Sequence, residues 1–387
     1  MDTAALKESW ELVAKSGDEV PLYFYSHLFL SHPELRELFP ISMTAQRDKL
    51  VGALGQIVSN VDQIDDVTPF IQQLGKDHRR FSVVADHYTA VGGSLLATLR
   101  RFLGPAWTES LANDWAAAYG LIAKVMVQAA EQSGDTPAWW SADVTDVQRR
   151  TLDVTVVQLR PREEFRYAPG QSFAMEVPQR PRLWRYFSPA NAPRSDGSVE
   201  LHVQPIDGGQ VSGAVVRSLQ PGDTVRLGAP IGERLTLPHP PDRDLLMVAG
   251  GTGLAPLRAV LEQLDRRWEV EGKAPRVHLF HGSRMAWNLY EHDYLSLLTS
   301  RPWFSYTPVV SDDPSYPGSC GLVGTVAAHA QRWDGRLVMV CGSPAMVRHT
   351  VEQLTAAGVA PTDIRYEEFT GGNHHPSAAP VAAGDNQ

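Results

Sequence analysis

The sequence has few cysteines, no long apolar run and no signal peptide. Cysteine occurs twice in 387 residues, as Cys320 and Cys341, without a pairing pattern. This usage argues against a disulfide framework and a four-thiolate cluster, and it fits a reducing compartment. No apolar run approaches the roughly 18 residues that span a bilayer, and Met1–Trp10 lacks the basic and apolar regions of a signal peptide. We therefore expect a cytoplasmic protein without a membrane segment.

An excess of positive charge is also missing. Lysine and arginine total 35 against 44 aspartate and glutamate residues, which gives a net charge of −9. Nucleic acids and anionic membranes are both polyanions that need a basic surface, so neither is expected as a partner. We expect small molecules as partners and a monomeric chain.

The length predicts two or three domains, and the pattern changes along the chain favour three. Residues 1–135 have the pattern of an all-helical domain. Their apolar residues recur at intervals of three and four, as in Leu50, Leu54, Ile57 and Val58, and strand-like alternation is nearly absent.

Short strands separated by glycine and proline follow, which is typical of a small antiparallel β-barrel, expected over 146–240. Over 241–371, buried-type strands alternate with helical stretches, which predicts a doubly wound parallel α/β sheet. The tail 372–387 is expected to be disordered. The expected strands are 152–157, 173–177, 199–203, 224–227, 245–249, 277–280 and 336–340, and the expected helices of the α/β domain are 256–267 and 345–357.

A glycine loop follows the strand at 245–249. It consists of Gly250, Gly251, Thr252 and Gly253, and a helix is expected from about Pro256. Glycines let the backbone approach a pyrophosphate, and the free N–H groups of the next helix face its charge. A structural turn is the alternative for such a loop when it stands alone.

Two further strand ends carry small or charged residues. Cys341 and Gly342 follow one buried strand, and Arg284 follows another. Open α/β sheets bind ligands at the carboxyl ends of their strands, so three such ends favour a nucleotide site. The guanidinium of Arg284 could bind a 2′-phosphate.

The order of these motifs resembles the ferredoxin-reductase-type module that binds FAD and NAD(P)H. The resemblance covers about 148–370 and implies FAD on the barrel. It places Arg185 near the FAD phosphates, Phe187 and Ser188 at the flavin, and Phe369 over the flavin face that nicotinamide reaches. The family usually has tyrosine where this chain has Phe187. The motifs that carry it are Arg185-Tyr186-Phe187-Ser188, Gly208-Gly209-Gln210-Val211-Ser212, Gly250 to Pro256, Cys341-Gly342 and Glu367-Glu368-Phe369.

Within the second motif, the resemblance places Gly209, Val211 and Ser212 near the FAD pyrophosphate. It also includes Gln210, and Tyr186 of the first motif, among the cofactor-binding residues. Arg284 followed by Asn288-Leu289-Tyr290 also resembles NADH-using reductases. NADH and NADPH therefore both stay open as electron donors.

Four histidines of the helical region, His27, His32, His78 and His87, could bind a haem iron. His78 lies four and eight residues after Leu74 and Phe70, so it shares an apolar helix face. This spacing alone does not separate an iron ligand from a core histidine.

The surrounding residues resemble bacterial haemoglobins. The similarity is carried by Phe24-Tyr25-Ser26-His27-Leu28-Phe29, by Ser31-His32-Pro33-Glu34, and by Phe39, Gln46, Leu50, His78, Tyr88 and Tyr119-Gly120 in this order. It implies His78 as the iron ligand of haem b, and Tyr25 and Gln46 as hydrogen-bond donors to O2. Leu50 would limit the pocket, Phe39 would contact the porphyrin, and Tyr88 would lie near His78.

One departure concerns the haem electronics. The family places a glutamate where this chain has Ala130, and its carboxylate bonds to the proximal histidine. Glu131 is adjacent, but one residue turns a helical side chain by about 100°, so Glu131 is not expected to reach His78.

Together the two regions resemble flavohaemoglobins, globins fused to an FAD and NAD(P)H reductase. The resemblance implies nitric oxide dioxygenation, in which NO and O2 become nitrate at a haem re-reduced through FAD. Two alternatives stay open. One is an NAD(P)H oxidase or haem reductase of another purpose, which Ala130 and Phe187 favour. The other is an O2 or NO sensor whose reductase resets the haem.

Overall fold

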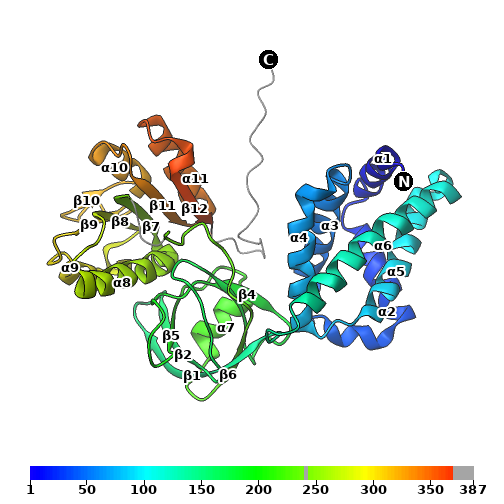
Figure 1. The fold of residues 1–387 in the computed structure, drawn as a ribbon, viewed down its shortest axis with the longest axis horizontal. Coiled ribbons are helices and arrows are strands. Elements are labelled where there is room, and N and C mark those ends of the chain that lie inside the picture. The colour runs from blue at the N-terminus through cyan, green and yellow to red at the C-terminus, as the bar shows by residue number, and fades with distance from the viewer. Residues whose placement is uncertain (239–242, 369–387) are drawn as a thin grey trace. The chain divides into compact units, whose positions relative to one another are not determined.

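A computed structural model of the chain describes residues 1–238 and 243–368. The chain divides into two compact units, Met1–Trp139 and the part from Trp140 onward, which we call the helical unit and the sheet unit (Figure 1). The expected disordered tail 372–387 and Phe369 lie outside the described residues.

The helical unit consists of α-helices with short 3-10 turns between them. A shared apolar cluster of residues such as Leu28, Leu99 and Trp115 packs α1, α2, α5 and α6 together, because each helix presents one apolar face. The bounds are α1 Thr3–Ala14, α2 Glu19–Ser31, η1 Pro33–Leu38, α3 Thr44–Ser59, α4 Ile64–His78, η2 Arg79–Phe81, α5 Ala85–Leu103, η3 Gly104–Ala106 and α6 Glu109–Gln132.

A glycine allows α4 to approach α6 closely. A Cβ atom on Gly75 would lie 2.2 Å from the backbone oxygen of Met126. Ile71 and Met126 are buried in the same small cluster between these helices. This contact fixes the last turn of α4, which ends at His78.

The first part of the sheet unit is an antiparallel barrel with strand order β4-β3-β6-β1-β2-β5. An antiparallel bridge between Pro189 and Leu201 joins the segment after β4 to β5 and so connects the two edges. The helix α7 adds Val211 and Val215 to the barrel core. The bounds are β1 Trp140–Arg149, β2 Thr155–Pro161, β3 Phe173–Glu176, β4 Trp184–Phe187, β5 Val199–Val203, α7 Gln210–Ser218 and β6 Thr224–Leu227.

The second part is a parallel sheet with strand order β10-β9-β8-β7-β11-β12. Alternate residues of β7 enter two different apolar clusters, Leu245 and Met247 on one face and Leu246 and Val248 on the other. Helices α8 and α9 cover the first face and α10 and α11 the second (Figure 1). This is the doubly wound arrangement that the sequence predicts.

The elements of this part have the following bounds: β7 Leu245–Gly250, η4 Gly251–Gly253, α8 Leu254–Glu271, β8 Val277–Ser283, η5 Ala286–Asn288, α9 His292–Leu298, β9 Phe304–Val310, β10 Ser319–Cys320, α10 Val323–Ala330, β11 Leu337–Gly342, α11 Pro344–Ala356, η6 Pro361–Asp363 and β12 Ile364–Glu368.

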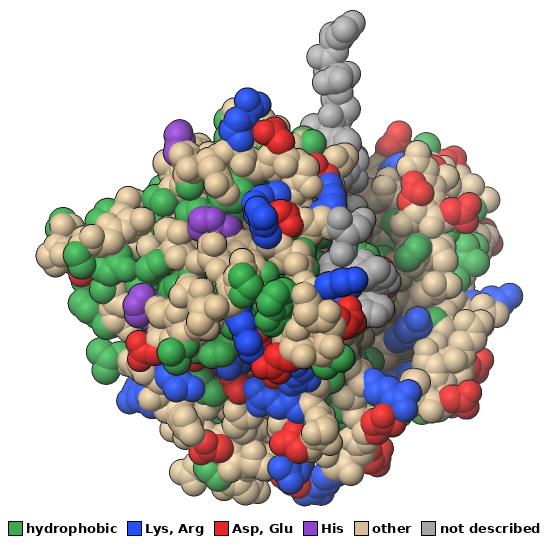
Figure 2. All heavy atoms as spheres, turned by 60° about the vertical axis from the view of Figure 1, so that its left-hand side comes forward, with side chains coloured by type: hydrophobic (Ala, Val, Ile, Leu, Met, Phe, Trp, Pro, Cys, Tyr) green, Lys and Arg blue, Asp and Glu red, His purple; other side chains and the backbone are tan. Residues whose placement is uncertain are grey.

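Two features of the surface bear on the expected partners. Among residues 1–238 and 243–368, no helix is both long and apolar enough to cross a membrane. On the face drawn in Figure 2, acidic and basic side chains are intermixed.

Candidate functional site

The predicted oxygen-binding residues of the helical unit lie together in an aromatic cluster. The Tyr25 ring lies edge-on to Phe39, with ring centroids 5.5 Å apart, and it stacks on Phe29 at 5.7 Å. Leu50 is partly buried against the same cluster. The Tyr25 hydroxyl donates to the backbone carbonyl oxygen of Gln46 at 3.4 Å.

The Tyr25 hydroxyl can exchange its present acceptor for another one. A distance of 3.4 Å is long for an O–H···O hydrogen bond, so the bond to Gln46 is weak. Burial raises the pKa of Tyr25 above its ordinary value, which keeps the hydroxyl protonated at all physiological pH values. The side chain of Gln46 is partly buried beside it on the first turn of α3.

The predicted iron ligand has one ring nitrogen bonded and the other available. The Nδ1 atom of His78 lies 2.6 Å from the carbonyl oxygen of Leu74. A carbonyl only accepts, so Nδ1 carries the proton and Nε2 keeps its lone pair. Burial lowers the pKa of His78, which also favours the neutral ring. Neutral imidazole with a bonded Nδ1–H is the form that binds metals, so this residue fits a haem iron.

Tyr88 lies near the His78 ring, whereas Glu131 is not bonded to it. The Tyr88 ring centroid lies 6.3 Å from that of His78, and Tyr119 donates from its hydroxyl to the Tyr88 carbonyl at 2.7 Å. Glu131 is exposed on α6. Within the described parts of the chain, no carboxylate is hydrogen-bonded to the His78 ring.

The predicted flavin-binding residues come from β4 and from the start of α7. Arg185, Tyr186 and Phe187 are partly exposed along β4, and Ser188 is buried just after it. Phe187 pairs in register with Phe173 of β3. The Arg185 guanidinium donates to the Trp184 carbonyl oxygen at 2.8 Å.

The second flavin motif forms a helix N-terminus. Gly209 caps α7, and a Cβ atom there would lie 2.6 Å from Ser212 Oγ and 2.8 Å from the Ile206 carbonyl oxygen. Only glycine fits this close turn. The first N–H groups of α7, from Gln210 onward, have no partner within the helix and are available to an anion. The Val211 side chain is buried in the barrel core, so its backbone N–H alone could reach a ligand.

The predicted nucleotide residues of β7 and β11 meet at one end of the parallel sheet. A Cβ atom on Gly253 would lie 2.2 Å from the Cys341 carbonyl oxygen, and one on Gly250 or on Gly342 would lie 3.1 Å from Met346. Thr252 is partly buried within the loop, and Pro256 is buried in the first turn of α8. Glycines at these positions let the loop pack closely against β11 and α11, and a strand, a glycine loop and a helix N-terminus in this order fit a pyrophosphate.

The loop conformation itself needs a glycine and has a buried support. Gly251 has a positive φ of 52°, which disfavours residues with a side chain. The ring of His281 is fully buried beneath the loop and donates from Nε2 to the Gly251 carbonyl oxygen at 3.1 Å. Burial raises the pKa of the Cys341 thiol well above its ordinary value, so the thiol stays protonated.

Arg284 is engaged differently from the expectation. It lies just beyond β8 with 84% of its side chain exposed, and its Nε donates to the carboxylate of Asp312 at 2.7 Å. The structure therefore pairs the predicted phosphate-binding cation with an acidic neighbour.

Comparisons with known proteins match each part of the chain in the expected order. A globin family matches residues 22–126, an oxidoreductase FAD-binding domain matches 142–235, and an oxidoreductase NAD-binding domain matches 247–352. The flavohemoprotein of Bacillus subtilis is 24% identical over 94% of this chain and 95% of its own length. The chain belongs to the flavohaemoprotein family.

Solved structures agree on the fold. A flavohemoglobin from Malassezia yamatoensis with bound FAD and heme is 17% identical, with a TM-score of 0.75 over 95% of this chain and 98% of that one. The FAD/NAD-binding domain of a nitric oxide dioxygenase from Vibrio cholerae is 21% identical, with a TM-score of 0.53 over 59% of this chain and 98% of that one.

Membership in the flavohaemoproteins confirms the predicted globin, antiparallel barrel and parallel-sheet domains. It likewise confirms haem, FAD and a nicotinamide nucleotide as the cofactors. The chain is thus an NAD(P)H oxidoreductase.

Several buried polar residues of the sheet unit are not predicted by the sequence patterns. Glu200 and His202 are buried in β5, and Arg258 and Glu291 bond to each other nearby. One indication was available, since Glu200 and His202 alternate with apolar residues in a strand that is buried throughout. Two polar residues on one face of such a strand need partners.

Proposed function

We propose that this flavohaemoprotein is a nitric oxide dioxygenase, which converts NO and O2 to nitrate with electrons from NAD(P)H. The observation that carries the proposal is the pair of sites in the helical unit. A buried hydroxyl donor, Tyr25, lies in an aromatic cluster with Phe29 and Phe39, and a neutral imidazole, His78, keeps Nε2 available for iron. Both sites share one chain with FAD- and NAD-binding domains.

The overall chemistry balances with one nucleotide for each pair of nitrate ions. Two NO and two O2 take the two electrons of one NAD(P)H, and the products are two nitrate ions, NAD(P)⁺ and one proton. When bound, haem would supply an iron for O2, and FAD would supply the exchange between two-electron hydride chemistry and single-electron transfer.

In the oxygen pocket, the roles that we propose depend on hydrogen bonding and shape. Tyr25 holds its proton at the hydroxyl because burial raises its pKa, and it donates to O2 with Gln46 beside it. Leu50 and Phe39 exclude water and limit the room beside the porphyrin. On the other side, Leu74 orients the His78 ring, and Tyr88 packs near it.

In the sheet unit, the proposed roles are binding and orientation. Arg185 and the N–H groups at the start of α7 hold the FAD phosphates. Gly250 to Gly253 and the first turn of α8 hold the nucleotide pyrophosphate. The further cofactor-binding residues that we propose are Tyr186, Phe187, Ser188, Gly209, Gln210, Val211, Ser212, Pro256, Arg284, Cys341 and Gly342.

The test is NAD(P)H-dependent removal of NO under air, followed with an NO electrode. Many NO molecules consumed per protein, with nitrate as the product, would support the dioxygenase. Loss of one NO per haem, without turnover, would instead identify a sensor. Tyr25→Phe should reduce the turnover by about tenfold, because a hydrogen bond to a partly charged group is lost. Tyr23→Phe on the same helix is the matched control and should have no effect.

A haem reductase or NAD(P)H oxidase of another purpose is the second candidate. It is favoured by the lack of a carboxylate on His78 among the described residues, because weaker electron donation to iron suits simple reduction better than oxygen chemistry. In that case nucleotide oxidation under air would proceed at the same rate with and without NO. The monomeric state and the cytoplasmic location stay predictions.

A further inference from the structure

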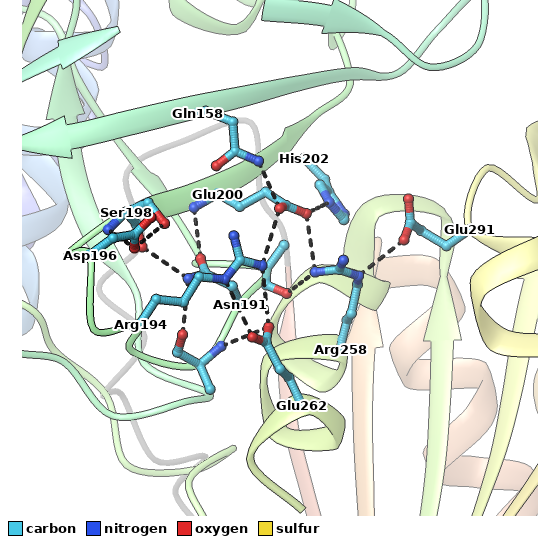
Figure 3. Close-up of polar contacts among 12 residues, drawn as sticks. Gln158, Asn191, Arg194, Asp196, Ser198, Glu200, His202, Arg258, Glu262 and Glu291 are labelled. Carbon is cyan, nitrogen blue, oxygen red and sulfur yellow. Dashed lines mark hydrogen bonds and ion pairs between the residues drawn. The ribbon is translucent and has the colours of Figure 1, made fainter. Parts of the chain in front are cut away.

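Helix α8 carries a stripe of charged residues that bond to a barrel segment. Arg258, Glu262 and Arg266 are spaced by four residues and so share one helix face. Arg258 Nη1 donates to the Ala190 carbonyl oxygen at 2.6 Å, and the Ala192 N–H donates to Glu262 at 3.2 Å. Arg266 donates to the Pro193 carbonyl oxygen. Three side chains of one helix thus hold the backbone of 190–193, and two of them, Arg258 and Glu262, are drawn in Figure 3.

Arg258 is the most buried cation of this stripe and is held by two carboxylates. Its side chain is 12% exposed, and it bonds to Glu200 at 3.1 Å and to Glu291 at 3.0 Å. Its guanidinium also lies over the Tyr294 ring, 4.8 Å from the centroid. The planar guanidinium has N–H groups in fixed directions and donates to two carboxylates and a carbonyl at once. Lysine cannot reproduce this arrangement.

Glu200 extends the same network into the barrel. It accepts from Gln158 of β2 at 2.8 Å and from His202 of β5 at 2.9 Å. Although burial works in the opposite direction, the His202 hydrogen bond and the charge of Arg258 hold the pKa of Glu200 well below its ordinary value. Glu200 is therefore ionised at physiological pH, and its carboxylate holds one side of the Arg258 guanidinium.

The two ends of this network lead to the two proposed cofactor sites. Helix α8 begins at Leu254, directly after the glycine loop, so Arg258 lies one turn from the proposed pyrophosphate site. The segment 190–193 begins two residues after Ser188, the end of the proposed flavin motif. A second buried contact runs parallel to it, in which His202 Nδ1 lies 3.0 Å from the hydroxyl of Tyr290.

We propose that Arg258 is a positioning residue that fixes the nucleotide loop relative to the flavin strand, and thereby sets the approach of nicotinamide to FAD. The proposal rests on the proposed cofactor sites. In the reaction the C–H bond at nicotinamide C4 breaks, and a hydride passes to FAD, which is reduced as the nucleotide is oxidised. The rate of such a transfer depends steeply on the distance and alignment of the reacting atoms.

The experiment is anaerobic stopped-flow reduction of FAD in the full-length protein, with haem and FAD bound, over a range of NADH concentrations. Arg258→Lys keeps the positive charge and loses the planar guanidinium. We expect its limiting rate of flavin reduction to fall on the order of tenfold, with the Kd for NADH and the FAD content within about twofold of the wild type. Deuterium at nicotinamide C4 should slow the variant at least as much as the wild type.

Arg267→Lys is the matched control, because Arg267 lies on the same helix and pairs at 2.8 Å with Glu271 of its own helix. It should leave the rate unchanged. Glu262→Gln is measured in parallel in case Arg258→Lys fails to fold, since glutamine keeps an oxygen for the Ala192 N–H, and a slower limiting rate there supports the proposal.

A limiting rate that is unchanged in both Arg258→Lys and Glu262→Gln would overturn the proposal. A raised Kd with an unchanged limiting rate would also overturn it, because Arg258 would then act on nucleotide binding alone. If the wild-type flavin is not reduced by NADH or NADPH at all, the proposed function fails instead, and this is established before any variant is compared.

Discussion

The Nδ1 atom of His78 lies 2.6 Å from the backbone carbonyl oxygen of Leu74, one turn earlier in α4. This neutral acceptor fixes the orientation of the ring and the position of its proton. It draws less on that proton than a carboxylate would, so it transfers less negative charge to the ring. The chain therefore orients its proposed iron ligand from its own helix and leaves the ligand weakly charged.

Replacing His78 tests its assignment as the iron ligand. His78→Ala should lose most of the haem and keep FAD, because the iron loses its protein ligand while the flavin site lies in the other unit. The absorbance ratio of the Soret band to the flavin bands of the purified protein measures both cofactors. His32→Ala, which changes a partly exposed histidine after α2, should retain both. A full Soret band in His78→Ala would point to another ligand.

Ala130→Glu should restore a carboxylate acceptor near the His78 ring. The added charge should strengthen the Fe–His bond and stabilise ferric iron. We expect the haem potential to fall on the order of 50 mV, equivalent to about 1 kcal/mol for one electron. The Fe–His stretching frequency in resonance Raman spectra of the ferrous protein should rise.

The neighbouring residue supplies the control for this change. Glu131 is exposed, so Glu131→Ala should change neither the potential nor the stretching frequency. If Glu131→Ala raises the potential while Ala130→Glu has no effect, then Glu131 is the residue that reaches the ring in solution.

Regular patterns made part of the fold predictable. The strands expected at 199–203 and 224–227 have the observed bounds. The strand β1 was missed, and it begins at Trp140, ahead of the expected barrel start at 146. An irregularity between Val144 and Asp146 breaks its pairing register, so its apolar residues do not alternate over the full length.

Two other elements run against local preferences. The expected strand at 152–157 begins in a turn, and β2 starts only at Thr155. The helix α7 follows two glycines and contains a third, Gly213, and glycine disfavours helices. Its apolar face is nevertheless buried against the barrel, and this tertiary packing outweighs the local preference.

The candidate sites were predictable where their residues are neighbours in sequence. The glycine loop and the motif from Arg185 to Ser188 could be read as units. The contacts of Arg258 could not, because Glu200 and Glu291 are far from it along the chain and each alone resembles a surface charge. The Arg284–Asp312 pair was hidden for the same reason.

The Arg284–Asp312 pair predicts a preference for NADH. The Asp312 carboxylate occupies the guanidinium and would repel a 2′-phosphate. Asp312→Asn should therefore raise kcat/KM for NADPH relative to NADH by about two- to fivefold. Arg284→Ala should lower the same ratio. Both changes should be small, because an exposed ion pair contributes little free energy. Steady-state rates of nucleotide oxidation, measured over a range of NADPH and of NADH concentrations, give the two kcat/KM values and their ratio. If neither variant moves it, the pair lies outside the nucleotide site.

The last prediction concerns Glu367, which is buried on β12 and pairs in register with Cys341 of β11. Its Oε1 has no hydrogen-bond partner among the described residues. Burial, opposed by the charge of Arg234, raises the pKa of Glu367 to about 7 from an ordinary value of 4.5. The folded protein therefore binds this proton more tightly than the unfolded chain does. The stability that the carboxyl contributes is complete below pH 4.5 and is lost as the pH rises through about 7.

Glu367→Gln removes this titration and keeps a neutral group of similar size. At pH 5 the sheet unit of the variant and that of the wild type should unfold at similar temperatures, because the wild-type carboxyl is then neutral. At pH 8 the variant should be more stable by roughly 3 kcal/mol, because the wild type must hold a buried charge. Calorimetry of the sheet-unit transition at both pH values measures the difference, and Glu368→Gln, one residue along the same strand, is the control. A difference between Glu367→Gln and the wild type that stays constant from pH 5 to pH 8 would contradict the prediction, because Glu367 would then keep one protonation state over this range.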